Sequence, residues 1–433
     1  MGRERYVDLL RAVAITAVVL GHWLVTVIER GPDGTLTGRS ALPDLRWAQP
    51  LTWLVQVLPI FFLVGGYANA ASLSSRYRRG GSAAGWLRDR SDRLVRPTTV
   101  LILVVTAGAI LAGLLGATPT QVRTAAWFAT VPLWFLAAYL AVVVLTPVMY
   151  ALHQRFGLAV PLVLVALVTV GDLARFHGPA MVATGSFLFG WLVMHQIGFV
   201  WRDRSVSRSP LGRRVSLTLL VGGSAALLAL TVAGPYPVSM INLPGERLQN
   251  MSPPSLALLA LATAQFGLIM LLREPAERWL REHRPWLVVV AVNSVVLTVF
   301  LWHVTAAILL AGGLDRIGRL PTAPAETAAW WLGRLPWLAL LTLVLAGLVA
   351  VFGRFEWRPG RSTTGWLSRP TARWPRRGPG GTLLVVAGYA AVICGLLVNS
   401  SAPRETAEPF GIPVAALVAY LAGAALLRTL RPE

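Results

Sequence analysis

Residues 5–23 read RYVDLLRAVAITAVVLGHW, an apolar stretch that carries only a few ionisable side chains. About 20 apolar residues are enough for a helix to cross a bilayer. Similar runs recur along all 433 residues, of which 55% are hydrophobic and 13% charged, and the mean hydropathy is +0.62. Since soluble domains carry about 25% charged residues, this composition excludes a soluble enzyme, a disordered chain and a secreted disulfide scaffold. We therefore expect a polytopic membrane protein.

The apolar runs predict the fold class, an all-α bundle of membrane helices with about ten core helices and two more at the C-terminal end. The predicted spans lie near 7–28, 51–72, 98–117, 132–153, 157–174, 181–201, 215–234, 255–272, 286–312, 335–353, 382–398 and 410–428. A stretch rich in Arg, Pro and Trp precedes the last two. We therefore expect a membrane domain over 1–353, a cytoplasmic linker over 354–381 and a helix pair over 382–433.

The charge of the chain orients these helices. The net charge is +20, and all 39 basic residues are arginines, most of them in short loops. With the N-terminus inside, 28 arginines lie on the cytoplasmic side and 10 on the outer side. This asymmetry predicts a plasma-membrane protein with both termini in the cytoplasm. No basic patch with interleaved aromatic residues stands apart from the loops, so we expect no nucleic-acid partner. The single cysteine, Cys394, predicts neither an intrachain disulfide nor a metal site.

Ionisable side chains inside a bilayer are costly and are therefore candidates for function. The first predicted helix holds three of them, Asp8, Arg11 and His22. At 100° per residue they share one face, with Asp8 and Arg11 close enough to pair and His22 about 16 Å further along. The alternative is structural, with Asp8 and Arg11 anchoring the helix end and His22 hydrogen-bonded in the core.

Two further features lie outside the first helix. His303, within VFLWHVTAA, lies at a depth similar to that of His22, so the two side chains are candidates to meet, although His303 also fits a packing layer beside Trp302. Arg90 and Arg93 lie in the cytoplasmic run WLRDRSDRLVRP. Guanidinium groups bind phosphate in a bidentate manner, which suits a phosphorylated ligand, although cytoplasmic loops are generally rich in arginine.

Several short segments, in this order along the chain, resemble membrane-bound acyltransferase family 3, the O-acetyltransferase-like transmembrane acyltransferases. Arg11 and His22 match that family's first-helix pattern of a basic residue, ten residues and a histidine. The other similar segments are DLLR at 8–11, FFLVGG at 61–66, RSDRLVRP at 90–97, LWFL at 133–136 and FLWH at 300–303. The chain departs from the family where Gly65 replaces a serine, and in its two additional C-terminal helices.

The resemblance implies an enzyme that transfers an acyl group, usually acetyl, from cytoplasmic acyl-CoA to a hydroxyl group. It implies catalytic roles for His22, Asp8 and His303, with His22 as base or acyl relay. Arg11, Arg90 and Arg93 would bind the donor. Acyl-CoA is then a substrate and no cofactor is permanently bound. The other partners would be membrane lipids and an acceptor among carbohydrates, lipids and natural products.

Two other classes of function fit part of the sequence. Twelve helices with both ends inside are also the layout of many secondary transporters, in which an Asp–Arg–His set relays protons. However, the chain lacks matching halves. A non-catalytic assembly factor is the third class. Turnover of acyl-CoA separates the enzyme from both. The residues specify neither the acceptor nor the acyl chain, and they leave the oligomeric state open.

Overall fold

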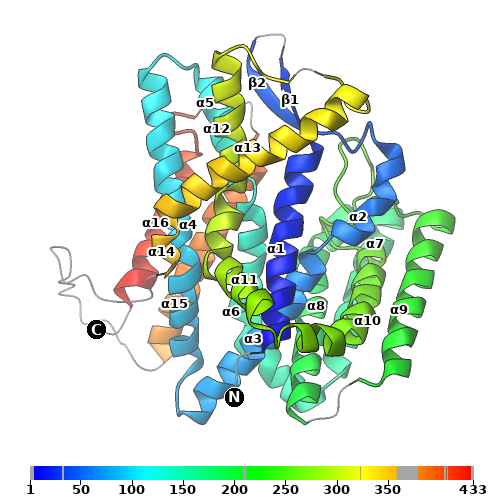
Figure 1. The fold of residues 1–433 in the computed structure, drawn as a ribbon. Coiled ribbons are helices and arrows are strands. Elements are labelled where there is room, and N and C mark those ends of the chain that lie inside the picture. The colour runs from blue at the N-terminus through cyan, green and yellow to red at the C-terminus, as the bar shows by residue number, and fades with distance from the viewer. Residues whose placement is uncertain are drawn as a thin grey trace. The chain divides into compact units, whose positions relative to one another are not determined.

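The structure is a computed structural model that describes residues 4–31, 34–207, 211–321, 323–357, 379–403, 406 and 408–430. Within them, eleven helices are long and apolar enough to cross a membrane, and the shorter apolar helix Val414–Thr429 corresponds to the twelfth predicted span. The prediction of an all-α polytopic bundle is confirmed (Figure 1). Most of the predicted linker lies outside the described residues, and the division at 353 and 382 stays a prediction.

The chain forms two compact units. The first comprises the residues up to 21, 41–75 and 145–293, and the second comprises 22–40, 76–144 and the residues from 294 onward. Helix α1 (Arg5–Val25) belongs mainly to the first unit, and α6 (Leu133–Phe156) is divided between the two. The other elements of the first unit are η1 (Arg46–Leu51), α2 (Thr52–Val55), α3 (Leu58–Arg78), α7 (Ala159–His177), η2 (Ala180–Gly185), α8 (Ser186–Val206), α9 (Arg213–Leu228), η3 (Ala229–Ala233), α10 (Leu256–Trp279) and α11 (His283–Ser294). Those of the second are β1 (Thr26–Arg30), β2 (Leu36–Ser40), α4 (Ala83–Leu114), α5 (Pro119–Thr130), α12 (Val296–Arg316), α13 (Ala328–Phe352), α14 (Arg354–Trp357), α15 (Pro379–Ser401) and α16 (Val414–Thr429).

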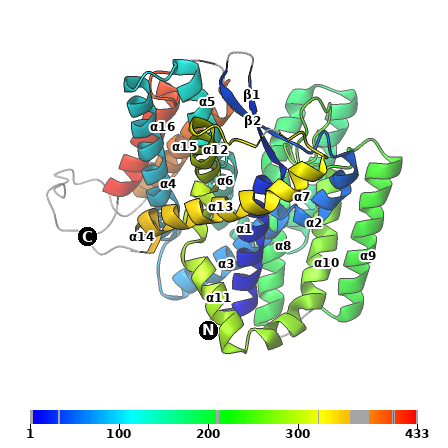
Figure 2. The ribbon, with the colours of Figure 1, turned by 45° about the horizontal axis from the view of Figure 1, so that its top comes forward.

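Glycines allow the helices of the first unit to pack with their backbones in contact. A Cβ atom at Gly66 of α3 would lie 2.0 Å from the carbonyl oxygen of His195 in α8, and one at Gly198 would lie 2.2 Å from that of Leu63. Gly223 also brings α9 close to α10, since its Cβ would lie 2.5 Å from the Ala264 amide nitrogen, and these two helices run side by side in Figures 1 and 2. Small residues at helix interfaces are the usual means of close packing in membranes.

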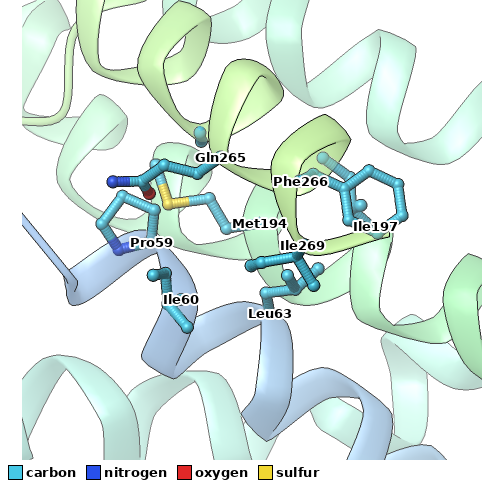
Figure 3. A pocket seen from close by; sticks show the side chains of 9 residues that line it. Pro59, Ile60, Leu63, Met194, Ile197, Gln265, Phe266 and Ile269 are labelled. Atoms are coloured by element: carbon cyan, nitrogen blue, oxygen red, sulfur yellow. The ribbon is translucent and has the colours of Figure 1, made fainter. Parts of the chain in front are cut away.

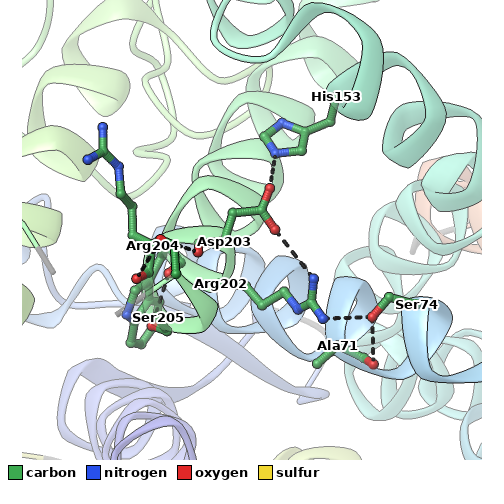
Figure 4. A network of polar contacts seen from close by, with 9 residues as sticks. Ala71, Ser74, His153, Arg202, Asp203, Arg204 and Ser205 are labelled. Carbon is green, nitrogen blue, oxygen red and sulfur yellow. Dashed lines mark hydrogen bonds and ion pairs between the residues drawn. The ribbon is translucent and has the colours of Figure 1, made fainter. Parts of the chain in front are cut away.

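Polar side chains join the C-terminal ends of three helices in the first unit (Figure 4). His153 Nε2 of α6 lies 3.0 Å from the Asp203 carboxylate of α8, which also pairs with Arg202. Arg202 then donates a 2.8 Å hydrogen bond to Ser74 Oγ of α3. This network joins α3, α6 and α8 at their C-terminal ends.

A buried aspartate organises the long connection between η3 and α10. The Asp172 carboxylate accepts hydrogen bonds from the Tyr236 hydroxyl and from the Leu256 amide, both at 2.8 Å, and it pairs with Arg175. Burial and the adjacent carboxylate both raise the pKa of the Tyr236 phenol above its usual range. Since Leu256 is the first residue of α10, Asp172 also satisfies an unpaired amide at that helix N-terminus.

A β-hairpin that the sequence analysis did not predict follows α1 directly. Strands β1 and β2 are antiparallel, with Thr26 opposite Ser40 and Arg30 opposite Leu36. Arg30 pairs with Asp315 at the end of α12. The hairpin therefore fixes the end of α1 against α12, within the second unit.

The predicted single span over 286–312 is wrong, because the helix breaks between Ser294 and Val296. The second segment, α12, begins at this break, which leaves backbone amides without intrahelical partners. The Glu356 carboxylate of α14 accepts hydrogen bonds from the amides of Leu297 and Thr298 at 3.0 and 2.8 Å. A carboxylate from α14, which lies beyond α13 in the sequence, therefore accepts from two amides at the break.

Helix α4 begins at Ala83, not near residue 98 as predicted, so Arg90 and Arg93 lie on a helix and not in a loop. Ser82 caps this helix through its side chain, which accepts from the Gly85 amide. The C-terminal pair α15 and α16 packs against α4 and α5 (Figure 2). Arg123 of α5, fully buried, donates to the carbonyls of Ala402 and Gly411 between the two helices.

Candidate active site

The predicted meeting of two histidines is confirmed. His22 lies in the last turn of α1 and His303 lies in the second turn of α12, and their Nδ1 and Nε2 atoms are 3.0 Å apart. The two rings are stacked, with centroids 5.1 Å apart and planes inclined by 15°. His303 is fully buried, whereas His22 is exposed at the surface of the second unit. The His22 imidazole is thus accessible, and the buried His303 imidazole is hydrogen-bonded to it.

The hydrogen bonds around this pair assign its tautomers. His303 Nδ1 lies 2.6 Å from the Phe300 carbonyl oxygen, which can only accept, so that nitrogen carries the proton. In a neutral ring the Nε2 atom of His303 then accepts, and His22 donates to it from Nδ1. This leaves Nε2 of His22 with an available lone pair. The accessible imidazole is therefore held in the tautomer that a general base or a nucleophile requires.

Aromatic residues beside His22 and His303 hold α12 in position. Trp23, which follows His22, donates from its indole nitrogen to the His303 carbonyl at 2.9 Å. Trp302 stacks on Phe352 of α13, with centroids 3.9 Å apart. These contacts hold both imidazoles in one geometry, as an active site requires of its reacting groups.

Asp8 and Arg11 are also brought together, with Oδ1 and Nη1 3.2 Å apart. Asp8 is buried, and its backbone carbonyl accepts a 2.8 Å hydrogen bond from the Asn293 side chain of α11. The pair lies in the first unit, and His22 and His303 lie in the second. The Asp8 backbone carbonyl therefore links α1 to α11. The catalytic role of Asp8 and the donor-binding role of Arg11 stay predictions.

Arg90 and Arg93 lie one turn apart on α4, within the same unit as His22. The Arg90 guanidinium lies over the ring of Trp86, 5.3 Å from its centroid, and Trp86 is buried. Arg93 is exposed. Aromatic stacking orients one cation while the other reaches solvent, an arrangement that fits phosphate binding.

Sequence analysis missed two buried polar residues. His195, which it did not single out, lies within α8, fully buried, and its Nε2 atom is 3.1 Å from the Asn69 amide nitrogen. Arg334 lies just before the predicted span 335–353, but the structure places it within α13, where it is buried. The spacing of Trp330, Arg334 and Trp337, which puts them on one helix face, would have identified Arg334 as an inward-facing residue.

The first unit also contains a small pocket lined almost entirely by apolar side chains (Figure 3). It lies among α3, α8 and α10, with Gln265 as its one polar residue. The Gln265 amide donates to the carbonyl of Gln56 at 2.8 Å. The pocket contains none of the predicted site residues, and its lining provides no nucleophile or base.

Comparison with known proteins adds one finding. A family model described as an acyltransferase domain matches residues 4–354, which include both histidines, both helices of the imidazole pair and all the other predicted site residues. Comparisons with curated proteins and with solved structures return no match.

Proposed function

This chain belongs to acyltransferase family 3 and is a multi-pass membrane acyltransferase, and from that premise we propose that it transfers an acyl group, with acetyl as the first candidate, from cytoplasmic acyl-CoA to a hydroxyl group. The acceptor would be a glycan, a glycolipid or a secreted metabolite. The enzyme would lie in the plasma membrane.

The observation that supports this proposal most strongly is the hydrogen-bonded pair of His22 and His303. Transfer to a hydroxyl needs a group that removes its proton as the oxygen attacks the thioester. His22 presents an accessible Nε2 atom for that purpose, and His303 holds its ring through Nδ1. His303 does not itself reach the surface, so it is a positioning residue for His22.

The proposed reaction proceeds in two steps. The acceptor oxygen gives its proton to His22 Nε2 and attacks the thioester carbonyl, which forms a tetrahedral intermediate. The C–S bond then breaks, the ester forms, and the imidazolium returns the proton to the thiolate of CoA. The alternative is that His22 Nε2 attacks the thioester first, the C–S bond breaks and CoA leaves as a thiolate. The acceptor oxygen then attacks the acyl-imidazole, the bond to Nε2 breaks, and the proton of the acceptor passes to the thiolate.

Arg90 and Arg93 would bind the donor through its phosphates at the start of α4. Both are in the same unit as His22, and the pantetheine arm is long and thin enough to bridge a phosphate site and a buried thioester site. Arg11 would contribute to donor binding and Asp8 would assist in catalysis or orient Arg11, with which it is paired.

The test is release of free thiol from acetyl-CoA by the purified full chain, without an acceptor, for wild type and His22→Ala. We expect slow release in the wild type and a loss of about 10²-fold or more in the variant, the usual contribution of a general base. His177→Ala, which removes an exposed histidine at the end of α7, should match the wild type.

Donor binding is measured on the same samples by thermal shift. Acetyl-CoA should stabilise both the wild type and His22→Ala, and less so the double variant Arg90→Gln/Arg93→Gln. Mass spectrometry without acceptor distinguishes the two routes, because an acyl group on His22 accumulates only if the imidazole attacks first. Neither thiol release nor stabilisation by CoA in the wild type would contradict the proposal.

A further inference from the structure

Helix α13 directs a single stripe of side chains inward. Its buried residues are Trp330, Arg334, Trp337, Leu341 and Leu345. The remaining surface is mostly apolar and exposed, as at Leu332, Leu335 and Leu343, which are 72%, 73% and 69% exposed. A helix otherwise covered by lipid thus brings one cation into the interior of the second unit. A buried charge within a membrane helix is costly and marks a functional site unless it is paired.

Arg334 lies between two indole rings. Its guanidinium carbon is 4.3 Å from the ring centroid of Trp330 and 5.7 Å from that of Trp337. Its Nη1 atom donates to the Thr26 carbonyl at 2.9 Å. No carboxylate pairs with Arg334 among the described residues, so the charge is compensated only by aromatic faces and one neutral oxygen.

Three buried donors around this cation have no acceptor in the described structure. They are Arg334 Nε and the indole nitrogens of Trp330 and Trp337. The three residues are between 3% and 8% exposed, so water does not reach these groups freely. Buried N–H donors that lack an acceptor beside a positive charge are groups suited to bind an oxyanion.

The cluster adjoins the imidazole pair. Thr26, which accepts from Arg334, follows His22 by four residues, about 6 Å along a helix, and its hydroxyl donates to the His22 carbonyl at 2.6 Å. Arg334 is near the N-terminal end of α13, which begins at Ala328 in the connection that the charge distribution places outside. A ligand bound there approaches His22 from the side opposite to that of the cytoplasmic donor.

We propose that Trp330, Arg334 and Trp337 form an acceptor subsite that binds an oxyanion of the acceptor, a carboxylate or a phosphate. This inference rests on the proposed function, since it takes His22 as the reacting group. The subsite selects acidic acceptors over neutral ones. Indole and guanidinium donors supply hydrogen bonds, and the guanidinium supplies the charge.

The test measures binding to the purified full chain by isothermal titration, so it does not depend on turnover. The probes are glucuronate, glucose 1-phosphate and glucose at equal ionic strength. We expect at least one of the two acids to bind about tenfold more tightly than glucose, the value of one hydrogen bond to a charged group. Whichever acid binds more tightly identifies the oxyanion as a carboxylate or a phosphate.

Variants of Arg334 and Trp337 test whether the preference for acids over glucose arises at this subsite. Arg334→Gln should abolish it, and Trp337→Phe, which keeps an aromatic ring but removes the indole donor, should reduce it about threefold. The control Arg319→Gln removes an exposed arginine near the end of α12 and should retain it. If Arg334→Gln fails to fold, Trp337→Phe still decides the question.

Two results would overturn the proposal: equal binding of all three probes by the wild type, or an unchanged preference in Trp337→Phe. Release of thiol from acetyl-CoA by the wild type is measured in parallel. If the thiol assay fails while acid binding persists, the proposed function is wrong and the oxyanion site stands. If only acid binding fails, the subsite alone is wrong.

Discussion

At the scale of single residues, the active-site candidate is a pair of imidazoles and not a histidine oriented by a carboxylate. The backbone carbonyl of Phe300 provides the terminal acceptor, so the pair is neutral as a whole. A neutral pair avoids the cost of placing a fixed negative charge in an apolar bundle. It also leaves the exposed imidazole with its lone pair at Nε2, the atom that an acceptor hydroxyl would meet.

His303 is expected to act only through His22. His303→Ala should lower kcat for thiol release about 10²-fold and leave the KM for acetyl-CoA unchanged, since the imidazole loses its orientation while donor binding persists. His303→Gln retains an oxygen that can accept from His22 Nδ1 and should recover part of the loss. Steady-state kinetics on both variants provide the check. Equal activity of His303→Ala and wild type would show that the pair is not catalytic.

The sequence predicted the contacts of some of these residues and not those of others. The depths of His22 and His303 predicted their contact, and the three-residue spacing predicted the pair of Asp8 and Arg11. Arg334 was missed because its flanking residues, including Pro336, made the hydropathy of that region resemble a loop. The spacing of Trp330, Arg334 and Trp337 puts all three on one helix face, but a single arginine near a helix end usually reaches the interface, so hydropathy alone did not indicate a buried arginine.

At the scale of helices, glycines allow short distances between the backbones of neighbouring helices in the first unit. Helices α9 and α10 offer a matched test because Gly222 and Gly223 are adjacent but face opposite environments. A Cβ atom at Gly222 would meet nothing within 4 Å, whereas one at Gly223 would lie 2.5 Å from the Ala264 amide nitrogen. The contact at Gly223 is with backbone, which cannot rotate away.

Gly223→Ala should destabilise the protein by about 1–3 kcal/mol, the usual cost of overpacking. Gly222→Ala should be neutral or slightly stabilising, since alanine favours a helix by up to about 1 kcal/mol over glycine. Thermal unfolding of the two variants in the same detergent measures the difference. Equal midpoints would mean that α9 and α10 do not pack at this glycine.

The ends of several helices are fixed by single capping side chains, which a hydropathy average over many residues does not detect. The prediction placed the start of α4 too late because Arg88, Arg90, Arg93 and Arg96 lower the hydropathy of a segment that Ser82 nevertheless caps as a helix. Strands β1 and β2 are five residues each and of mixed polarity, so they carry no clear periodic signal. The break before α12 depends on Glu356, which is distant in sequence.

At the scale of the whole molecule, the arginine distribution predicts which ends of the helices face the cytoplasm. The chain lends itself to a direct test because Cys394 is its single cysteine. In a Cys394→Ala background, Thr118→Cys and Ser207→Cys each introduce one thiol at an exposed position. Position 118 precedes α5 in a predicted outer connection, and 207 follows α8 in a predicted inner one.

A membrane-impermeant maleimide added to intact cells should label Thr118→Cys and not Ser207→Cys. Inverted vesicles should show the reverse, because the arginine-rich connections remain in the cytoplasm. Both variants should label after detergent is added, which controls for thiol reactivity. Labelling of Ser207→Cys in intact cells would invert the predicted topology and with it the side from which the donor arrives.

The contact between Glu356 and the start of α12 has a consequence for biosynthesis. The carboxylate lies 59 and 58 residues after the amides of Leu297 and Thr298 that it satisfies. Until the ribosome has added Glu356, those two amides lack this acceptor, and an unsatisfied amide in the hydrocarbon region of a bilayer costs several kcal/mol. Helix α12, and the histidine that it carries, therefore reaches its final place only after α13 has been inserted. Synthesis order thus delays assembly of the imidazole pair until more than three-quarters of the polypeptide exists.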